Sequence, residues 1–372
     1  MTEPADQRPV AFVHNWAPDY RRGLFEVLAA RQDVRFLLFG GRSLHEQDLG
    51  EQVARLDAPA ESIAQGDIGR VLTEGDFRAV VASTNGRVAL ASAYRAARRS
   101  GLPFVLWASM WRHPRTAAQL LGWPLTRHLY RRADAVVTYG THVSRYVARH
   151  RPAGKIFEAP QATDNERMGA APDAQERDEV RRRTGGRPFV LSVGRLVPEK
   201  GVDVVARAWA MEPEPAGDAL LVCAGTGPQE RAMRDIPHTE LLGHVPLDGL
   251  RAWYAEARAV VLASVPTRRF LEPWGFVCNE ALLQGTPVVA TTAVGAVAGG
   301  LVTDGETGLV VPAGDARALR AALDRLLADP QLAASFGVQG RERVLREYTH
   351  TTQAAGFERA LGAVGAARPS AR

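Results

Sequence analysis

The stretch FVLSVGRLVPEKG, residues 189–201, indicates the fold class. Its first five residues are mostly apolar and β-branched, Gly194 follows them, and a short turn containing Pro198 leads through Gly201 into an apolar segment over 202–211. This order predicts a buried strand, a tight turn and a helix. Buried strands that alternate with helices form a parallel sheet covered by helices on both faces, so the stretch predicts an α/β protein.

The same alternation continues in both directions from this stretch. Before it, strands are expected at 10–15, 34–40, 79–84, 103–109, 135–139 and 155–158, with helices at 20–31, 88–100, 117–132 and 142–149. From it onward, strands are expected at 189–193, 219–224, 240–242, 259–263, 287–291 and 308–311, with helices at 202–211, 247–256, 276–284, 316–328 and beyond Pro330.

A polar break between the two series separates two Rossmann-like domains. We expect an N-terminal domain over residues 1–165, a linker over 166–186 that contains Gly185-Gly186, and a second domain over 187–345. The segment 346–372 is expected to be a helix that crosses back to the first domain, followed by a tail. Ligands of such sheets bind beyond the carboxyl ends of the strands, so we expect both domains to face one cleft.

The composition is that of a soluble globular protein long enough for two domains. Of the 372 residues, 46% are hydrophobic and 23% charged. The first residues do not have the pattern of a secretion signal, and no apolar run approaches the ~18–20 residues that cross a bilayer. Cys223 and Cys278 lie in separate apolar runs, which favours reduced, buried thiols. These features predict a cytoplasmic protein.

Positive charge is concentrated in residues 85–155. This segment has twelve Arg and one Lys but one acid, Asp134, in a chain of net charge +5. One interpretation is a set of solvated helix faces. The other is a basic face that attracts an anionic acceptor or the inner face of a membrane, to which the protein would bind peripherally. No nucleic-acid-binding motif accompanies the charge, so nucleic acid is not an expected partner.

The segment 192–201 brings two cations close to the end of a strand. Arg195 directly follows Gly194, and Lys200 lies just before the helix that is expected to start near Val202. Cations beside the amide end of a helix form a site for a diphosphate. The alternative is a structural turn with two surface cations. The segment is not a Walker loop, because its lysine precedes the glycine and no Ser or Thr follows.

A second motif, FLEPWGFVCNEALLQGTPVVA over residues 270–290, carries two carboxylates. Glu272 lies in a loop before Pro273 and Gly275, and Glu280 lies in the helix that follows. Carboxylates accept hydrogen bonds from sugar and ribose hydroxyls, whereas amides at the start of a helix bind phosphate or hydroxyl oxygens. Glu280 is flanked by apolar residues, which argues against a fully solvated acid.

Sequence patterns for a metal centre are absent. The chain has no His-x-x-x-His, Cys-x-x-Cys or Asp-x-Asp pattern. We therefore expect no bound metal and no cofactor.

Three segments together resemble the family 4 retaining glycosyltransferases, group 1 glycosyl transferases that have the GT-B fold. They are Gly194-Arg195 with Lys200-Gly201, the pair Glu272 and Glu280, and the run 294–312 with its DGETGLVVP ending. The resemblance covers most of residues 187–350. It implies two Rossmann-like domains that face each other, a nucleotide-sugar donor and no metal.

The resemblance also implies roles for particular residues around the donor. Gly194, Arg195 and Lys200 would hold the diphosphate, and Arg195, Lys200 and Glu272 would be catalytic. The transferred sugar would contact Glu272 and the backbone of Trp274, Gly275 and Phe276. The remaining donor contacts would come from Val277 on a phosphate, Glu280 on the ribose, and His244 and Val245 on the nucleobase.

The first domain matches less well and supplies the candidates for binding the acceptor. The residues that follow its first expected strand are Asn15, Trp16, Tyr20 and Arg21, where the family usually has a glycine-rich loop. Ser109 occupies the position of a histidine found in many members, and Trp111 and His113 come shortly after it. These seven residues are the candidates for the acceptor side.

The resemblance thus implies a retaining, metal-independent hexosyltransferase. Its donor would be a nucleoside-diphosphate sugar of the UDP or GDP type, and its acceptor a glycan, a lipid-linked saccharide or a small natural product. Two alternatives remain: an epimerase or hydrolase of the same fold that acts on nucleotide sugars, and a non-catalytic protein that binds nucleotide sugars or glycans. A nicotinamide-dependent dehydrogenase is not expected, because no Gly-x-Gly-x-x-Gly follows the first strand.

Overall fold

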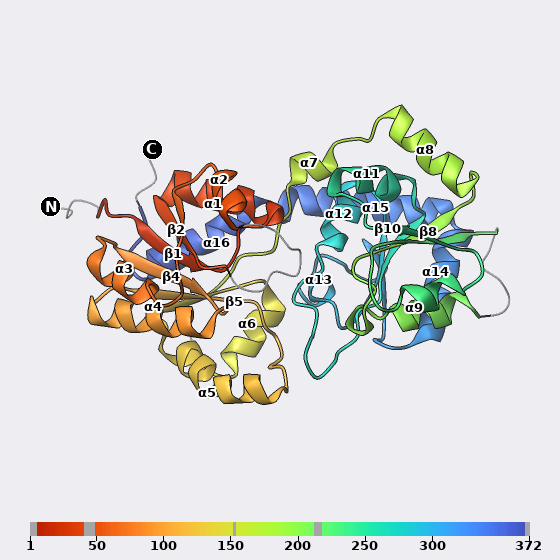
Figure 1. Ribbon diagram of the computed structural model, residues 1–372. Coiled ribbons are helices and arrows are strands. Elements are labelled where there is room, and N and C mark those ends of the chain that lie inside the picture. Colours follow the sequence, from red (N-terminus) through yellow and green to blue (C-terminus); the bar gives the residue numbers. More distant parts are fainter. Residues whose placement is uncertain (1–5, 41–48, 152–153, 212–217, 369–372) are drawn as a thin grey trace. The chain divides into compact units, whose positions relative to one another are not determined.

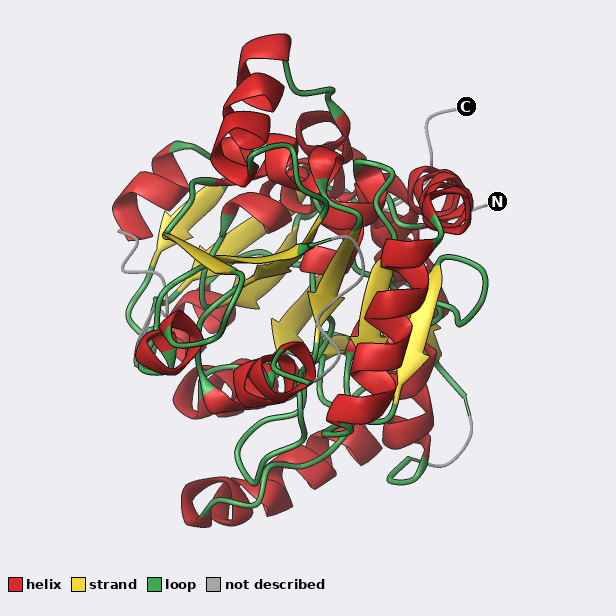
Figure 2. Cartoon of the chain, turned by 90° about the vertical axis from the view of Figure 1, so that its right-hand side faces the viewer, coloured by secondary structure: helices red, strands yellow, loops and turns green. Residues whose placement is uncertain are grey.

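The structure is a computed structural model that describes residues 6–40, 49–151, 154–211 and 218–368. It divides into two compact units. Unit 1 contains the chain up to Asp164 together with the residues from His350 onward, and unit 2 contains Asn165–Thr349. Each unit is an α/β structure in which helices flank a sheet (Figures 1 and 2).

Unit 1 is built on a seven-stranded parallel sheet. Its strands are β1 (Val10–His14), β2 (Val34–Leu38), β3 (Ala60–Ser62), β4 (Ala79–Ser83), β5 (Phe104–Ala108), β6 (Ala135–Thr138) and β7 (Ile156–Glu158). They lie in the order β3-β2-β1-β4-β5-β6-β7. Strands β1, β4, β5 and β6 are buried along their whole length, which explains why their sequences are apolar except at the last residue of β1, β4 and β6.

Seven helices are described in unit 1. They are α1 (Asp19–Gln32), α2 (Leu49–Ala54), α3 (Ile68–Glu74), α4 (Arg87–Arg99), α5 (Ala117–Arg132), α6 (Thr141–Ala148) and α16 (His350–Ala363). The apolar pattern of the sequence does not predict α2, α3 or β3. These elements are short, and β3 is only partly buried, so they lack a sustained apolar pattern. The last helix, α16, packs against α1, β6 and β7.

Unit 2 contains a six-stranded parallel sheet in the order β10-β9-β8-β11-β12-β13. The strands are β8 (Phe189–Val193), β9 (Leu220–Ala224), β10 (Thr239–Gly243), β11 (Ala259–Leu262), β12 (Val288–Thr291) and β13 (Gly308–Val311). The helical elements are α7 (Asn165–Gly169), α8 (Ala174–Thr184), the 3-10 turn η1 (Pro198–Lys200), α9 (Val202–Trp209), α10 (Glu230–Arg234), α11 (Leu247–Glu256), α12 (Val277–Leu283), α13 (Gly295–Ala298), α14 (Ala316–Ala328) and α15 (Pro330–Glu347).

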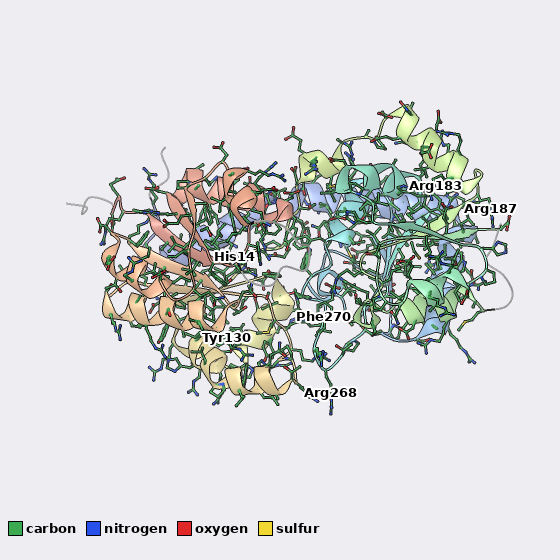
Figure 3. All side chains as sticks on the ribbon, in the orientation of Figure 1. His14, Tyr130, Arg183, Arg187, Arg268 and Phe270 are labelled. Carbon is green, nitrogen blue, oxygen red and sulfur yellow. The ribbon has the colours of Figure 1, made fainter. Side chains whose placement is uncertain are left out.

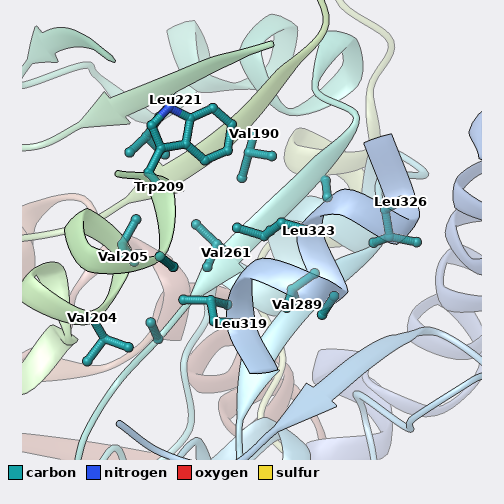
Figure 4. Packing of buried hydrophobic residues seen from close by; sticks show 14 of the residues in the cluster. Val190, Val204, Val205, Trp209, Leu221, Val261, Val289, Leu319, Leu323 and Leu326 are labelled. Carbon is teal, nitrogen blue, oxygen red and sulfur yellow. The ribbon is translucent and has the colours of Figure 1, made fainter. Parts of the chain in front are cut away.

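The main apolar cluster of unit 2 lies between its sheet and helices α9 and α14. Val190, Val261 and Val289 come from three strands and pack against Trp209 of α9 and Leu323 of α14 (Figure 4). Branched side chains on parallel strands give this face of the sheet a continuous apolar surface. This packing holds the sheet in place, and with it the start of each turn that leaves its carboxyl edge.

The segment 166–186, expected as a linker, contains α7 and α8 and groups with unit 2. Helix α8 is strongly polar, and its start is fixed by a capping box between Asp173 and Glu176. Arg177 and Arg181 both pair with Glu256 of α11. These polar contacts therefore hold the segment 166–186 against the rest of unit 2, although its composition alone is typical of a loop.

The structure also describes the surroundings of the two cysteines and the length and polarity of the helices. Cys223 and Cys278 are buried free thiols, and burial raises the pKa of Cys223 to about 12. Within the described parts of the chain, every helix is too short or too polar to cross a bilayer.

Candidate functional site

The site in unit 2 is formed by turns at the carboxyl edge of its sheet. The turns after three neighbouring strands are linked through their backbones: Gly194 N donates to Ala224 O at 2.9 Å, and Gly225 N donates to Gly243 O at 2.7 Å. The edge is therefore held by main-chain hydrogen bonds. Gly194 and Arg195 leave β8 at this edge, as the sequence predicted.

Lys200 is positioned by a close approach of two backbones. It is the last residue of η1, and Gly201 follows with φ 69°. A Cβ atom on Gly201 would lie 1.9 Å from the carbonyl oxygen of Ala263, just beyond β11. A glycine is therefore required where the β8–α9 turn crosses the end of β11.

Lys200 and Glu272, 72 positions apart in the sequence, meet at this edge. Lys200 Nζ lies 2.5 Å from Glu272 Oε2, and Ser264 Oγ donates to the same oxygen at 3.0 Å. The Glu272 side chain is 8% exposed and that of Lys200 22%. Lys200 Nζ also lies 5.8 Å from the ring centroid of Phe270, which lies two positions before Glu272 in the same loop (Figure 3).

The loop that carries Glu272 is packed against the turn after β12. Glu272 forms a parallel bridge with Val294, and Ala296 N donates to Trp274 O at 2.7 Å. A Cβ on Gly295 would lie 2.0 Å from Pro273 O. The position of the Glu272 carboxylate is therefore fixed by its backbone.

Trp274 is packed in the interior of unit 2, and its carbonyl oxygen already accepts from Ala296 N. The residue is 1% exposed, and its Nε1 donates to Asn279 Oδ1 at 2.7 Å. Its ring packs against that of Tyr348 at 5.7 Å between centroids. Gly275 and Phe276 continue the turn, and Val277 is the first residue of α12.

The second carboxylate, Glu280, is held by a buried tyrosine. Tyr254 of α11 is fully buried, and its hydroxyl donates to Glu280 Oε2 at 2.6 Å. Tyr254 is itself anchored, because Thr286 Oγ1 donates to its carbonyl oxygen at 2.5 Å. Burial raises the pKa of Glu280 above its ordinary value, and the bond from Tyr254 opposes that rise.

The remaining predicted donor residues are more exposed. Arg195 is about one third exposed and lies 3.6 Å from Glu199. His244 and Val245 follow β10, where His244 is exposed and Val245 partly so. The structure thus brings together Lys200 and Glu272, and leaves Arg195, His244 and Val245 accessible nearby along the edge.

The arrangement suits a ligand with both anionic and hydroxyl groups. Arg195 and Lys200 offer positive charge, and each charge-assisted hydrogen bond from them is worth about 1.5–3 kcal/mol. Each glutamate has Oε2 occupied by a protein donor, so its geometry is set before a ligand arrives. A carboxylate fixed in this way can accept hydrogen bonds from sugar or ribose hydroxyls.

In unit 1, Arg21 lies in an aromatic group at the carboxyl edge of the sheet. Its guanidinium carbon lies 4.3 Å from the ring centroid of Trp107, and Nη2 donates to the Tyr139 hydroxyl. His14, the last residue of β1, lies 5.2 Å from Trp107 between ring centroids (Figure 3). Burial, together with the charge of Arg21, lowers the pKa of His14 well below its ordinary value, so this imidazole is neutral.

The other candidates of unit 1 fall into separate surroundings. Asn15 Oδ1 accepts from Asn85 Nδ2 at 3.2 Å, and Tyr20 O lies 3.2 Å from His350 Nε2. Trp16 and Ser109 are partly buried, and Trp111 lies 5.2 Å from His142 between ring centroids.

His113 belongs to a different group of side chains. Its Nε2 lies 3.0 Å from Gln119 O, and its ring lies 4.4 Å from that of Trp123, both in α5. Ser109 instead interacts with Tyr139. Ser109 and His113, the two candidates for the role of the histidine found in many family members, thus have different neighbours.

Three residues that interact with the predicted site were not among the candidates, namely Tyr254, Ser264 and Tyr139. Tyr254 and Ser264 hold the two glutamates, and Tyr139, together with Trp107, encloses Arg21. Ser264 is the second residue after β11, so a search of the residues that follow each strand would have included it. Tyr254 lies in a helix 26 positions before Glu280, and no spacing rule links the two.

A family model described as "Glycosyl transferases group 1" matches residues 187–329. A curated relative from Mycolicibacterium smegmatis, named GDP-mannose-dependent alpha-(1-6)-phosphatidylinositol monomannoside mannosyltransferase, is 33% identical over 63% of this chain. The match spans 65% of that relative's length. The lipopolysaccharide core biosynthesis mannosyltransferase LpcC of Rhizobium leguminosarum bv. viciae is 31% identical over 68% of each chain.

Among solved structures, the chain is similar to Alr3699/HepE of Anabaena, crystallised with UDP and glucose. The superposition has a TM-score of 0.75, covers 96% of this chain and 100% of the other, and has 16% sequence identity. At that identity the likeness shows the fold.

Proposed function

This chain belongs to the group 1 glycosyl transferases and has the two Rossmann-like halves of the GT-B fold, and from that premise we propose that it transfers a sugar from a nucleoside-diphosphate sugar to a hydroxyl of an acceptor. The observation that carries the proposal is the contact of Lys200 with Glu272 at 2.5 Å, within the segment that the family model matches. This contact supports the proposal because it joins a cation suited to a diphosphate with a carboxylate suited to sugar hydroxyls.

In this proposal, unit 2 binds the donor along the carboxyl edge of its sheet. Arg195 and Lys200 hold the diphosphate beside Gly194, Glu272 accepts from hydroxyls of the sugar, and Glu280 accepts from the ribose. The turn with His244 and Val245 adjoins the nucleobase, and Val277 contributes its amide to a phosphate. The proposed base is uracil or guanine, because the relative from Mycolicibacterium smegmatis is named as GDP-mannose-dependent and the Anabaena structure contains UDP.

The chemistry we propose retains the configuration of the anomeric carbon and uses no metal. The bond from that carbon to the diphosphate oxygen breaks while the acceptor oxygen attacks from the same face. The departing phosphate oxygen takes the acceptor proton, and Arg195 and Lys200 stabilise the negative charge that develops on it. The anomeric coupling constant of the product decides this point, since an inverted product would reject retention.

We assign the acceptor side to unit 1. The proposed contacts are the residues at or near the carboxyl edge of its sheet, namely Asn15, Trp16, Tyr20, Arg21, Ser109, Trp111 and His113. Trp107 is 2% exposed and belongs to the core of the unit. We propose a glycan, lipid-linked or small-molecule acceptor, with peripheral contact between the basic residues of unit 1 and an anionic membrane.

Calorimetric titration with UDP, GDP, dTDP and ADP in the presence of EDTA tests the donor site. We expect micromolar binding of UDP or GDP without added metal, and we expect Glu280→Ala to weaken it about tenfold or more, because the ribose loses a charged acceptor. Failure of all four nucleotides to bind would reject the donor site. Binding without release of nucleoside diphosphate from any donor, with or without acceptors, would indicate a non-catalytic protein.

Tyr254→Phe tests whether the buried hydroxyl positions Glu280. Loss of this hydrogen bond should weaken nucleotide binding about tenfold. The bond lowers the pKa of Glu280, which burial raises, so its loss raises that pKa further. Binding needs the ionised carboxylate and is lost as pH falls through its pKa. In Tyr254→Phe the loss should therefore begin at a higher pH.

Tyr348→Phe is the matched control, because it removes a tyrosine hydroxyl that donates to Gly299 O at 3.3 Å in the same unit. Its nucleotide affinity and pH profile should equal those of the wild type. The difference in affinity between wild type and Tyr254→Phe should be smaller for a 2′-deoxynucleotide than for the ribonucleotide. Equal pH profiles for wild type and Tyr254→Phe would contradict the positioning role.

A further inference from the structure

Helix α5 (Ala117–Arg132) exposes one continuous face to solvent. Eight of its residues are exposed: Ala117, Leu120, Leu121, Pro124, Arg127, His128, Arg131 and Arg132. With 3.6 residues per turn, these eight side chains fall within an arc of about 140°. The opposite side of the helix contains the buried Leu129 and Tyr130, so the orientation of α5 on unit 1 is fixed (Figure 3).

The first half of this α5 face is apolar. Leu121 is 82% exposed and Leu120 54% exposed, which is unusual for large aliphatic side chains. The helix starts at a fixed point, because the Thr116 side chain accepts from Gln119 N. A Cβ on Gly122 would lie 3.1 Å from Arg87 Nε, so a guanidinium lies against the helix next to Leu121.

The second half of the α5 face is basic. It contains Arg127, Arg131 and Arg132, and α5 contains no acidic residue. The nearest acid in sequence, Asp134, is already engaged: it pairs with Arg98 at 3.1 Å and accepts from Phe104 N at 2.8 Å. The positive charge of this half is therefore not balanced by acids of the helix itself.

We propose that the α5 face binds the surface of an anionic bilayer. Leu120 and Leu121 would enter the boundary between headgroups and acyl chains, and the arginines would contact lipid phosphates. A second copy of this chain is a poor occupant, because equivalent faces would bring arginines against arginines. The inference rests on the membrane contact of the proposed function and names the surface that makes it, and its test does not depend on the donor chemistry.

Co-sedimentation of the full chain with vesicles tests the inference. Vesicles of phosphatidylcholine with about one third phosphatidylglycerol should bind the protein at low salt, and pure phosphatidylcholine should bind it far less. Binding should weaken steeply as ionic strength rises, because the phosphate contacts are screened. The double variant Leu120→Ser, Leu121→Ser should lower the partition coefficient at least about tenfold, since two apolar side chains lose their burial. Each of Arg127→Gln, Arg131→Gln and Arg132→Gln should lower it about fivefold.

The double variant Val338→Ser, Leu345→Ser is the matched control. These apolar residues of α15 are 58% and 46% exposed and lie in unit 2. Their replacement should leave vesicle binding unchanged. Nucleotide binding by the α5 variants should equal that of the wild type, which shows that they fold. The proposal is overturned if the protein does not bind anionic vesicles at low salt. It is also overturned if the α5 double variant binds vesicles as well as the α15 control does, or if the α5 face captures an acidic protein and no vesicles.

Discussion

Lys200→Ala is expected to lower turnover about 10²–10³-fold, the effect of removing one donor to a charge that develops in the transition state. Lys200 Nζ lies 2.5 Å from Glu272 Oε2 on a side chain that is 22% exposed. At such a partly buried position its charge is only weakly screened. The measurement is the rate of nucleoside diphosphate release from the donor that calorimetry selects. Arg195→Ala should also lower the rate of nucleoside diphosphate release.

Arg207→Ala is the control for this prediction. Arg207 lies on α9, seven positions after Lys200, and pairs with Asp203 at an exposed site. Its removal takes one positive charge from the same region and should leave turnover within about twofold of wild type, as for most exposed ion pairs. Near-normal turnover in both Lys200→Ala and Arg195→Ala would show that these cations do not hold the leaving group.

Gly201→Ala is expected to destabilise the protein by roughly 2–5 kcal/mol. Its backbone has φ 69°, and a Cβ there would lie 1.9 Å from the Ala263 carbonyl oxygen. One of the two backbones must move, and Lys200 moves with it, so turnover should fall as well. The urea midpoint followed by tryptophan fluorescence measures the loss of stability.

Gly185→Ala separates the cost of the backbone conformation from the cost of the collision. Gly185 has φ 63° and ends α8, but a Cβ there would meet nothing within 4 Å. This variant should lose only about 1 kcal/mol, the ordinary cost of a left-handed residue with a side chain. Equal losses in Gly185→Ala and Gly201→Ala would show that the β8–α9 turn can move away from β11 without penalty.

The apolar pattern predicted the long elements and missed the short or polar ones. Buried strands such as β5 and β11 have continuous apolar runs, because neighbours cover both faces of a parallel sheet. The edge strand β3 and helix α8 have no such runs. Strand β3 is held by its backbone pairing with β2, and α8 by its cap and by Glu256. Hydrogen bonds and ion pairs to distant residues leave no periodic signal.

For the site, the sequence by itself identified the chemical groups, because cations and carboxylates that end strands or flank turns stand out in an apolar chain. Only the tertiary structure decided which of them meet. Lys200 reaches Glu272 because the β8–α9 turn crosses the end of β11, and Tyr254 reaches Glu280 because α11 packs on α12. Such contacts depend on strand order and on close approaches between backbones, and these are properties of the packed chain rather than of any single segment.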